Sequence, residues 1–291
     1  MQQQPEAAGA ASTLVRFWGV RGSIPTPGPA TVQVGGNTSC VEVRVGDRIL
    51  ILDAGTGLRL LGLQLLQEFG FRPLDLTLLL THTHWDHIQG LPFFSPLYHD
   101  RNTLHILGLQ GSRHSLERVL NSQMEIPFFP IGLRDVPGNI RIEELNSPGI
   151  TLDNIHITAC KANHPGHCVG YKIQTPDGTI AFFPDHETIP QAPGTDAVTA
   201  FLRGVDLLIM DSQYDEAHYE NHRGWGHGCV KDVVTQALKA EVRRLVLFHH
   251  DPCSDDAAVA RMEEEARAQV RLSGGSLEVM AAREGLELSL P

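Results

Sequence analysis

The chain alternates short apolar runs with polar stretches, and the period of each run predicts the element that it forms. Continuous apolar runs bounded by turn residues predict buried strands, and apolar residues at helical spacing predict helices. We expect strands within residues 15–18, 40–45, 49–52, 75–80, 104–107, 150–162, 169–174, 179–183, 207–210, 245–248 and 276–280. We expect helices over residues 58–69, over 112–124 with Ser112 as N-cap, from 224–228 to about 240, and over 254–272.

Many of the predicted strands are followed by a histidine or an aspartate. A single polar residue at a strand end needs only a hydrogen-bond partner, but six in one chain predict a shared site at one edge of a sheet. The six residues are Asp53, His82, His164, Asp185, Asp211 and His249.

The densest group of candidate metal ligands directly follows the predicted strand 75–80, in the stretch Thr81-His82-Thr83-His84-Trp85-Asp86-His87. If this stretch is extended, His82 and His84 point the same way and can bind one ion. Asp86 and His87 can then turn toward a second ion. The spacing therefore predicts a metal site with room for two ions.

Residues far along the chain complete this site in our interpretation. His164 and His249 are the candidates for the remaining ligands, and Asp185 is the candidate for a bridging carboxylate. Two ions about 3.5–4 Å apart can produce hydroxide from bridging water near neutral pH. We expect two divalent ions, with zinc favoured by the imidazole ligands and manganese or iron as alternatives.

Composition and charge restrict the substrate. Lys and Arg number 23 and Asp and Glu number 34, so the net charge is −11. An acidic surface repels long polyanions, which disfavours long nucleic acid as a partner. A small anionic substrate bound at a metal centre remains compatible with this charge.

The chain length and termini predict one domain in the cytoplasm. No long linker divides the 291 residues, so we expect a flexible tail over residues 1–12 and a single domain over 13–291. No apolar stretch is long enough to span a membrane, and the N-terminus lacks the features of a secretion signal. Five cysteines without CxxC spacing argue against a disulfide framework.

The apolar stretch of residues 126–130, Ile-Pro-Phe-Phe-Pro, has two interpretations. It is either ordinary core or a hydrophobic lid or homodimer surface near the metal site. The sequence does not decide between them.

The stretch from His82 to His87 resembles the signature of the metallo-β-lactamase-fold hydrolases, and Asp53, His164, Asp185 and His249 stand in that family's order. The resemblance extends from about Val15 to Leu288. It implies an α+β fold, a four-layer αββα sandwich with a dinuclear site at one sheet edge. It implies the metal ligands His82, His84, Asp86, His87, His164, Asp185 and His249.

Around these ligands, the resemblance implies supporting roles for two residues. Asp53 is expected to fix the histidine loop without binding metal. His250 is expected to support the site, although the sequence leaves open whether His249 or His250 is the last ligand.

Within the superfamily, the chain resembles the phosphodiesterase branch that includes RNase Z. The stretch His164-Pro165-Gly166-His167-Cys168-Val169-Gly170-Tyr171 resembles its metal histidine followed by Gly-Tyr. Asp211 and the Gly226-His227-Gly228 motif resemble its acid and its Gly-His-Ser/Thr, with glycine here in place of Ser/Thr. The resemblance implies that His227 protonates the leaving oxygen and that Asp211 orients His227, with Asp86 also in the catalytic set.

These observations lead us to expect a phosphodiesterase that cleaves a small phosphodiester, such as a cyclic nucleotide, by attack of metal-bound hydroxide. The alternatives are an RNA 3′-processing endonuclease, a thioesterase or lactonase-type hydrolase, and a non-hydrolytic metalloprotein of cofactor biosynthesis with the same fold. A basic surface for RNA is missing from the sequence, which places the endonuclease second.

Overall fold

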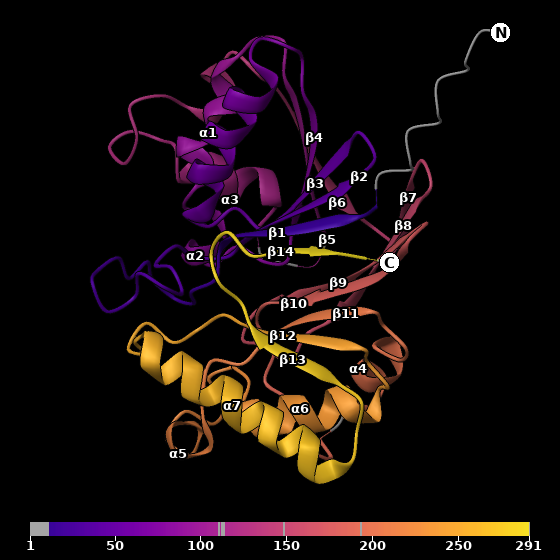
Figure 1. Ribbon diagram of the computed structural model, residues 1–291. Coiled ribbons are helices and arrows are strands. Elements are labelled where there is room, and N and C mark those ends of the chain that lie inside the picture. The colour runs from indigo at the N-terminus through magenta and orange to yellow at the C-terminus, as the bar shows by residue number, and fades with distance from the viewer. Residues whose placement is uncertain (1–11, 110, 112–113, 148, 193, 291) are drawn as a thin grey trace, which may run out of the picture.

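Two seven-stranded sheets pack face to face, and helices cover the outer face of each (Figure 1). The computed structural model describes residues 12–109, 111, 114–147, 149–192 and 194–290. The layers follow the order helix, sheet, sheet, helix, which confirms the expected α+β αββα sandwich.

The first sheet has the strand order β14-β1-β2-β3-β4-β5-β6. Helices α1 (Gly57–Phe69) and α3 (Leu116–Ser122) lie above this sheet in Figure 1, and α2 (Trp85–Ile88) lies near its lower edge. Three short 3-10 helices, η1 (Leu91–Phe93), η2 (Ser95–Tyr98) and η3 (Leu133–Asp135), belong to the same half. The strands are β1 (Leu14–Gly19), β2 (Cys40–Val45), β3 (Arg48–Leu52), β4 (Asp75–Leu80), β5 (Thr103–Leu109), β6 (Asn139–Leu145) and β14 (Glu287–Ser289).

The second sheet has the strand order β13-β12-β11-β10-β9-β8-β7. Helices α4 (Thr195–Phe201), α5 (Glu216–Tyr219), α6 (Val230–Lys239) and α7 (Asp256–Ser273) lie below it in Figure 1. The strands are β7 (Gly149–Leu152), β8 (Ile155–Lys161), β9 (Val169–Thr175), β10 (Gly178–Phe183), β11 (Leu207–Asp211), β12 (Arg244–Phe248) and β13 (Glu278–Ala281).

Burial on both faces explains why the central strands read as continuous apolar runs. In β3, Leu50 and Leu52 pack into the core between the two sheets. Ile49 and Ile51 point to the other face and belong to the core under α1. A strand covered on both faces has no polar face, so its sequence does not alternate. This packing holds the strand ends, and the residues that follow them, in fixed positions.

Two helices begin later than the sequence predicts. Ser115, not Ser112, caps α3, because its hydroxyl accepts a hydrogen bond from the backbone N–H of Arg118. Ser112 itself lies outside the described residues. The stretch 224–228 is a loop because Gly224 and Gly226 have φ of 84° and 89°, which no right-handed helix contains.

The edge strand β6 is absent from the sequence prediction. Its residues alternate between exposed and half-buried positions, and its polar side chains interrupt the apolar run by which the other strands are predicted. The short edge strand β14 and the helices α4 and α5 are likewise not predicted.

The stretch 126–130 is not ordinary core. Ile126 and Phe128 are exposed, whereas Phe129 packs edge-on against Phe93 with ring centroids 5.6 Å apart. The core interpretation is therefore wrong for the two exposed side chains.

Within the described residues, no helix combines the length and the apolar character needed to cross a membrane. Residues 1–11 of the predicted tail lie outside the described part of the chain, so the division into a tail and one domain stays a prediction.

Candidate metal centre

The predicted ligands come from both halves of the sandwich, and their ligand atoms lie close together. The loop after β4 supplies His82 and His84, and α2 supplies Asp86 and His87. In the second half, each ligand follows or connects strands of the sheet. His164 lies between β8 and β9, Asp185 follows β10, and His249 follows β12.

Three overlapping groups of ligand atoms form among the described residues, with the atoms of each group within 4.8 Å of one another. His82, His84, His164 and Asp185 form the first group, and Asp86, His87 and His249 form the second. Asp185, His227 and His249 form the third, so the structure brings all the predicted ligands together and places His227 beside them.

The two carboxylate oxygens of Asp185 face different groups. Its Oδ2 lies 3.7 Å from Nε2 of His82 and 3.5 Å from Nε2 of His164. Its Oδ1 lies 3.0 Å from Nε2 of His87 and 3.2 Å from Nε2 of His249. A carboxylate placed in this way can bridge two ions.

The unpaired atoms at the centre fit divalent cations. Nε2 of His82 is buried and has no hydrogen-bond partner among the described residues, and Nε2 of His87 and Oδ1 of Asp185 are buried 3.0 Å apart without forming a well-aligned hydrogen bond. Buried polar atoms without a partner are costly, and a bound cation would satisfy all three. Histidine and carboxylate ligands suit zinc above all.

The electrostatics leave two of the imidazoles ready to bind a cation, whereas at His87 the charge of Asp86 outweighs burial and raises the pKa. Burial lowers the pKa of His82 and of His84, so both imidazoles stay neutral and keep a lone pair for a metal. Burial alone would raise the pKa of Asp86, but the imidazoles of His87 and His249 lower it below its usual range. Asp86 is therefore a carboxylate at neutral pH.

Hydrogen bonds from the surrounding residues orient the ligand imidazoles. The Oδ2 atom of Asp53 lies 2.7 Å from Nδ1 of His87, and the Oδ1 atom of Asp53 accepts the backbone N–H of Thr81 at 2.9 Å. Nδ1 of His164 donates to the carbonyl oxygen of Gly226 at 2.9 Å. A protonated Nδ1 leaves Nε2 of these rings free to bind an ion. The predicted supporting position of Asp53 agrees with this geometry.

His249, and not His250, faces the centre. Nε2 of His249 lies 3.2 Å from Oδ2 of Asp86, and its Nδ1 lies 3.1 Å from Oε1 of Gln213. Nε2 of His250 instead donates to the carbonyl oxygen of Ala282 at 2.9 Å. Of the two alternatives that the sequence leaves open, the direction of the side chains favours His249 as the ligand.

His227 and Asp211 form a pair at the edge of the centre. Nδ1 of His227 lies 2.8 Å from Oδ2 of Asp211. Burial disfavours the imidazolium, but the charge of Asp211 outweighs burial and raises the pKa of His227 to about 9. The ring of His227 stacks on the ring of His249, with centroids 5.0 Å apart. His227 can therefore hold a proton next to a ligand of the second group.

The sequence analysis did not identify the part that the glycine-rich loop 19–36 plays in this site. The backbone N–H of Ser23 donates to Oδ2 of Asp86 at 2.8 Å, and Gly22 packs against His249. A Cβ at Gly22 would lie 2.3 Å from Nδ1 of His249. A high glycine content allows a loop backbone to pack closely against other residues, but the sequence does not show that His249 is the residue contacted.

Glu187 is a second residue that the sequence analysis missed. Its buried carboxylate accepts the backbone N–H groups of Gly224 at 2.8 Å and of Gly226 at 3.1 Å, and the hydroxyl of Tyr219 at 2.9 Å. These hydrogen bonds hold the loop that precedes His227. Its position two residues after Asp185 was the only available signal.

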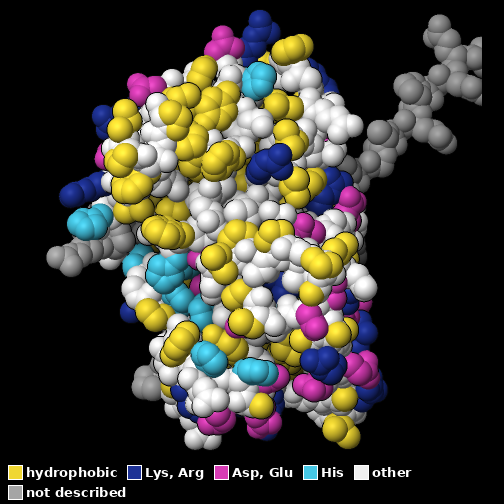
Figure 2. Space-filling view, turned by 90° about the vertical axis from the view of Figure 1, so that its left-hand side faces the viewer, with side chains coloured by type: hydrophobic (Ala, Val, Ile, Leu, Met, Phe, Trp, Pro, Cys, Tyr) yellow, Lys and Arg dark blue, Asp and Glu magenta, His cyan; other side chains and the backbone are white. Residues whose placement is uncertain are grey.

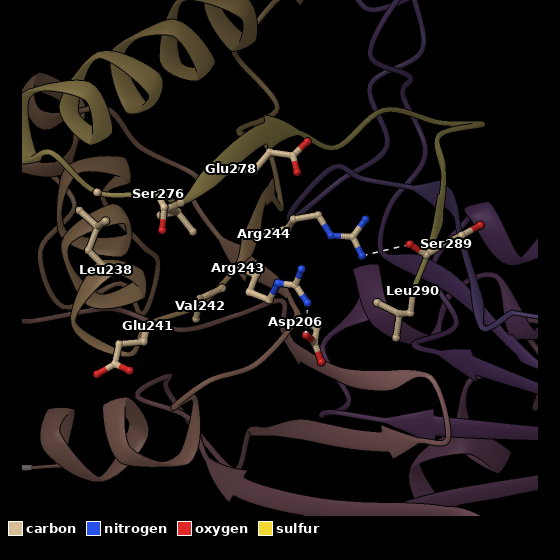
Figure 3. A pocket seen from close by; sticks show the side chains of 12 residues that line it. Asp206, Leu238, Glu241, Val242, Arg243, Arg244, Ser276, Glu278, Ser289 and Leu290 are labelled. Atoms are coloured by element: carbon tan, nitrogen blue, oxygen red, sulfur yellow. Dashed lines mark hydrogen bonds and ion pairs between the residues drawn. The ribbon is translucent and has the colours of Figure 1, made fainter.

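A groove at the far end of the second sheet has no part in this site. It lies beside the first residues of β12 and β13 (Figure 3). Its arginines are already paired, because Arg243 contacts Asp206 at 3.2 Å and Arg244 donates to the carbonyl oxygen of Ser289 at 3.0 Å. None of the candidate ligands lines it.

Comparisons with known proteins agree with this fold. Ribonuclease BN of Salmonella paratyphi B is 23% identical over 237 residues, which cover 65% of this chain and 75% of the relative. The metallo-beta-lactamase fold protein YhfI from Bacillus subtilis has a TM-score of 0.69 at 20% identity, with 96% of this chain and 99% of that chain covered. A diphosphatase from the PhnP family has a TM-score of 0.68 at 19% identity, with 96% and 98% covered.

The family comparison covers most of the site. Residues 48–250 match the model of the Beta-lactamase superfamily domain, and this range contains every candidate metal ligand together with Asp211 and His227. The chain therefore belongs to the β-lactamase superfamily and has the metallo-β-lactamase fold.

Proposed function

We propose that this protein is a dinuclear metal-dependent phosphodiesterase that acts on small phosphodiesters. The observation that carries this proposal is the position of the His227–Asp211 pair beside two ligand groups that the two oxygens of Asp185 connect. A hydrolase that only activated water would not need a separately oriented histidine to protonate the leaving group.

The ligands of the two ions are assigned from the two groups. His82, His84 and His164 would hold one ion, Asp86, His87 and His249 would hold the other, and Asp185 lies where it could serve both. Two bound ions, for which zinc fits best, would supply an activated water and offset the charge that develops on phosphorus.

The side chains of this protein perform the proton transfer. His227 donates a proton to the leaving oxygen, since Asp211 keeps its Nδ1 protonated and leaves Nε2 free for the substrate. Asp53 and Gly226 keep their imidazole partners in the tautomer that binds metal. Ser23 keeps Asp86 in place through its backbone N–H.

The charge of the protein supports a small substrate. The described contacts of the ligand atoms come from histidine, aspartate, glutamine, threonine, cysteine and backbone groups, without a lysine or arginine. With a net charge of −11, the surface gives no attraction to a long phosphate backbone.

RNA 3′-end processing is the second candidate, and the similarity to Ribonuclease BN favours it. Turnover by the zinc-loaded and manganese-loaded protein on bis(p-nitrophenyl) phosphate, cyclic nucleotides and a tRNA precursor separates the two. The proposal expects cleavage of the small diesters and little cleavage of the precursor. Cleavage of the precursor alone would favour the second candidate.

A further inference from the structure

Two exposed tryptophans lie next to the candidate metal centre. The side chain of Trp85 is 81% exposed and that of Trp225 is 59% exposed. The chain has three tryptophans, and the third, Trp18, is half-buried and donates its indole N–H to Glu42 at 2.9 Å. Exposed apolar side chains that gather beside a polar site mark ligand contacts, whereas scattered ones need no explanation.

One imidazole brings the two tryptophan-bearing segments together. Nε2 of His164 lies 3.1 Å from Nδ1 of His84, the residue before Trp85. Nδ1 of the same ring donates to the carbonyl oxygen of Gly226, the residue after Trp225, at 2.9 Å. Trp85 from the first half and Trp225 from the second half are therefore each one residue away from a contact of His164. The surface beside this histidine is called the opening of the centre below.

This opening is the accessible side of the metal centre. Most ligand side chains are buried, but His84 is exposed and His227 is partly exposed. Figure 2 shows histidine side chains open to solvent on this face, with hydrophobic side chains on both sides of them. A substrate that reaches the ions must pass between these apolar borders.

The aromatic character continues away from the opening on both sides. Trp225 packs edge-on against His222 with centroids 4.8 Å apart, and His222 stacks on Tyr214 at 4.5 Å. In the first half, Phe93 follows α2 and is 58% exposed. His222 supports Trp225 in this way, and both tryptophans remain largely exposed.

We propose that Trp85 and Trp225 bind a flat aromatic ring of the substrate, so that the preferred phosphodiesters carry a nucleobase or a similar ring. This inference rests on the proposed function. The ions and His227 recognise only the phosphate and the leaving oxygen, and no cationic side chain contacts the described ligand atoms. Stacking on an indole face gives affinity for a planar ring without hydrogen-bond readout.

A matched pair of substrates tests the proposal. The p-nitrophenyl ester of thymidine monophosphate and p-nitrophenyl methyl phosphate have the same leaving group and differ in the presence of a base. We expect Trp85→Ala to lower the ratio of kcat/KM for the nucleoside ester over the methyl ester about five-fold or more. Trp85→Phe keeps an aromatic face and should restore most of this ratio.

Phe71→Ala is the matched control. Phe71 is 86% exposed but lies before β4, at the end of that strand opposite to the ligand loop. Its substitution should leave the ratio unchanged. An equal loss on both substrates in Trp85→Ala, or no change in the ratio, would overturn the proposal.

A binding measurement decides the proposal without turnover. In Trp225→Phe the fluorescence comes from Trp85 and the half-buried Trp18. Thymidine monophosphate should quench the Trp85 part, which Trp85→Ala/Trp225→Phe identifies by its absence, and inorganic phosphate at the same concentration should not. Equal effects of both ligands, or no effect of either, would overturn the proposal. If the metal-loaded protein hydrolyses neither substrate, the proposed function fails, and this quenching result still decides whether the indoles bind a base.

Discussion

Nδ1 of His227 lies 2.8 Å from Oδ2 of Asp211. This contact gives the site an oriented proton donor in addition to its candidate metal ligands. The same carboxyl group accepts the backbone N–H of His186 at 3.1 Å and of Gln213 at 3.1 Å. Asp211 is therefore held rigidly by the chain and can in turn fix the imidazole.

We predict that His227→Ala lowers kcat on bis(p-nitrophenyl) phosphate about 10²–10⁴-fold, the usual contribution of a positioned acid. Metal content, measured by elemental analysis, should not change, because the two groups assigned to the ions do not include His227. Asp211→Asn should also lower kcat, since the amide removes the charge that keeps His227 protonated. Loss of an ion in His227→Ala would make it a metal ligand instead.

We predict opposite effects for the two adjacent histidines after β12. His249→Ala should lose one of the two ions, because its Nε2 faces Asp86 and Asp185. His250→Ala should keep both ions and lower thermal stability, because it removes only the hydrogen bond to Ala282. Elemental analysis together with thermal unfolding checks both variants, and a normal metal content in His249→Ala would contradict the assignment.

We predict that Gly22→Ala lowers activity without lowering expression severely. An added Cβ would lie 2.3 Å from Nδ1 of His249, so the ligand must move. Gly28→Ala in the same loop is the control, because nothing lies within 4 Å of a Cβ there. The two variants are compared by metal affinity and kcat/KM, and equal values for both would show that the contact with His249 does not matter.

We predict that Glu187→Gln lowers kcat more than it changes metal content. The amide cannot accept all the hydrogen bonds that the carboxylate receives from Gly224, Gly226 and Tyr219. An unpaired buried donor costs about 1–3 kcal/mol of stability, so the melting temperature should also fall. Tyr219→Phe removes one of the three bonds and should show a smaller effect on kcat. A Glu187→Gln protein with unchanged turnover would exclude a positioning role for this carboxylate.

Removal of metal should destabilise the fold. The carboxylate of Asp185 is buried against the imidazole of His87. Nε2 of His82, Nε2 of His87 and Oδ1 of Asp185 form no well-aligned hydrogen bond that could replace a bound ion. Exhaustive dialysis against a chelator is expected to lower the melting temperature, and zinc should restore it in proportion to occupancy. An unchanged melting temperature in a protein shown to be metal-free would argue against a centre built for ions.

The parts of the site that the sequence predicts are those with a local or periodic signal. His82 to His87 form a dense cluster after an apolar strand, and Asp185 and His249 each follow another such strand. The sandwich itself was available only through the resemblance, because the continuous apolar runs do not show how two sheets pack. The order of the strands within each sheet is known only from the structure.

The parts that the sequence does not predict depend on the backbone of distant segments. Ser23 acts through its N–H on Asp86, 63 residues away, and Glu187 binds the N–H of Gly226, 39 residues away. Any residue type except proline has a backbone N–H, so the sequence carries no mark of these contacts. The choice between His249 and His250 likewise depended on side-chain direction, which neighbouring residues in a sequence do not reveal.

The central claim is that two ions and the His227–Asp211 pair together cleave small phosphodiesters. The most direct measurement is turnover of bis(p-nitrophenyl) phosphate and a cyclic nucleotide by protein whose metal content has been determined in the same sample. The account predicts about two ions per chain and hydrolysis that falls when either ion is removed. A protein with both ions bound that cleaves no phosphodiester would contradict it.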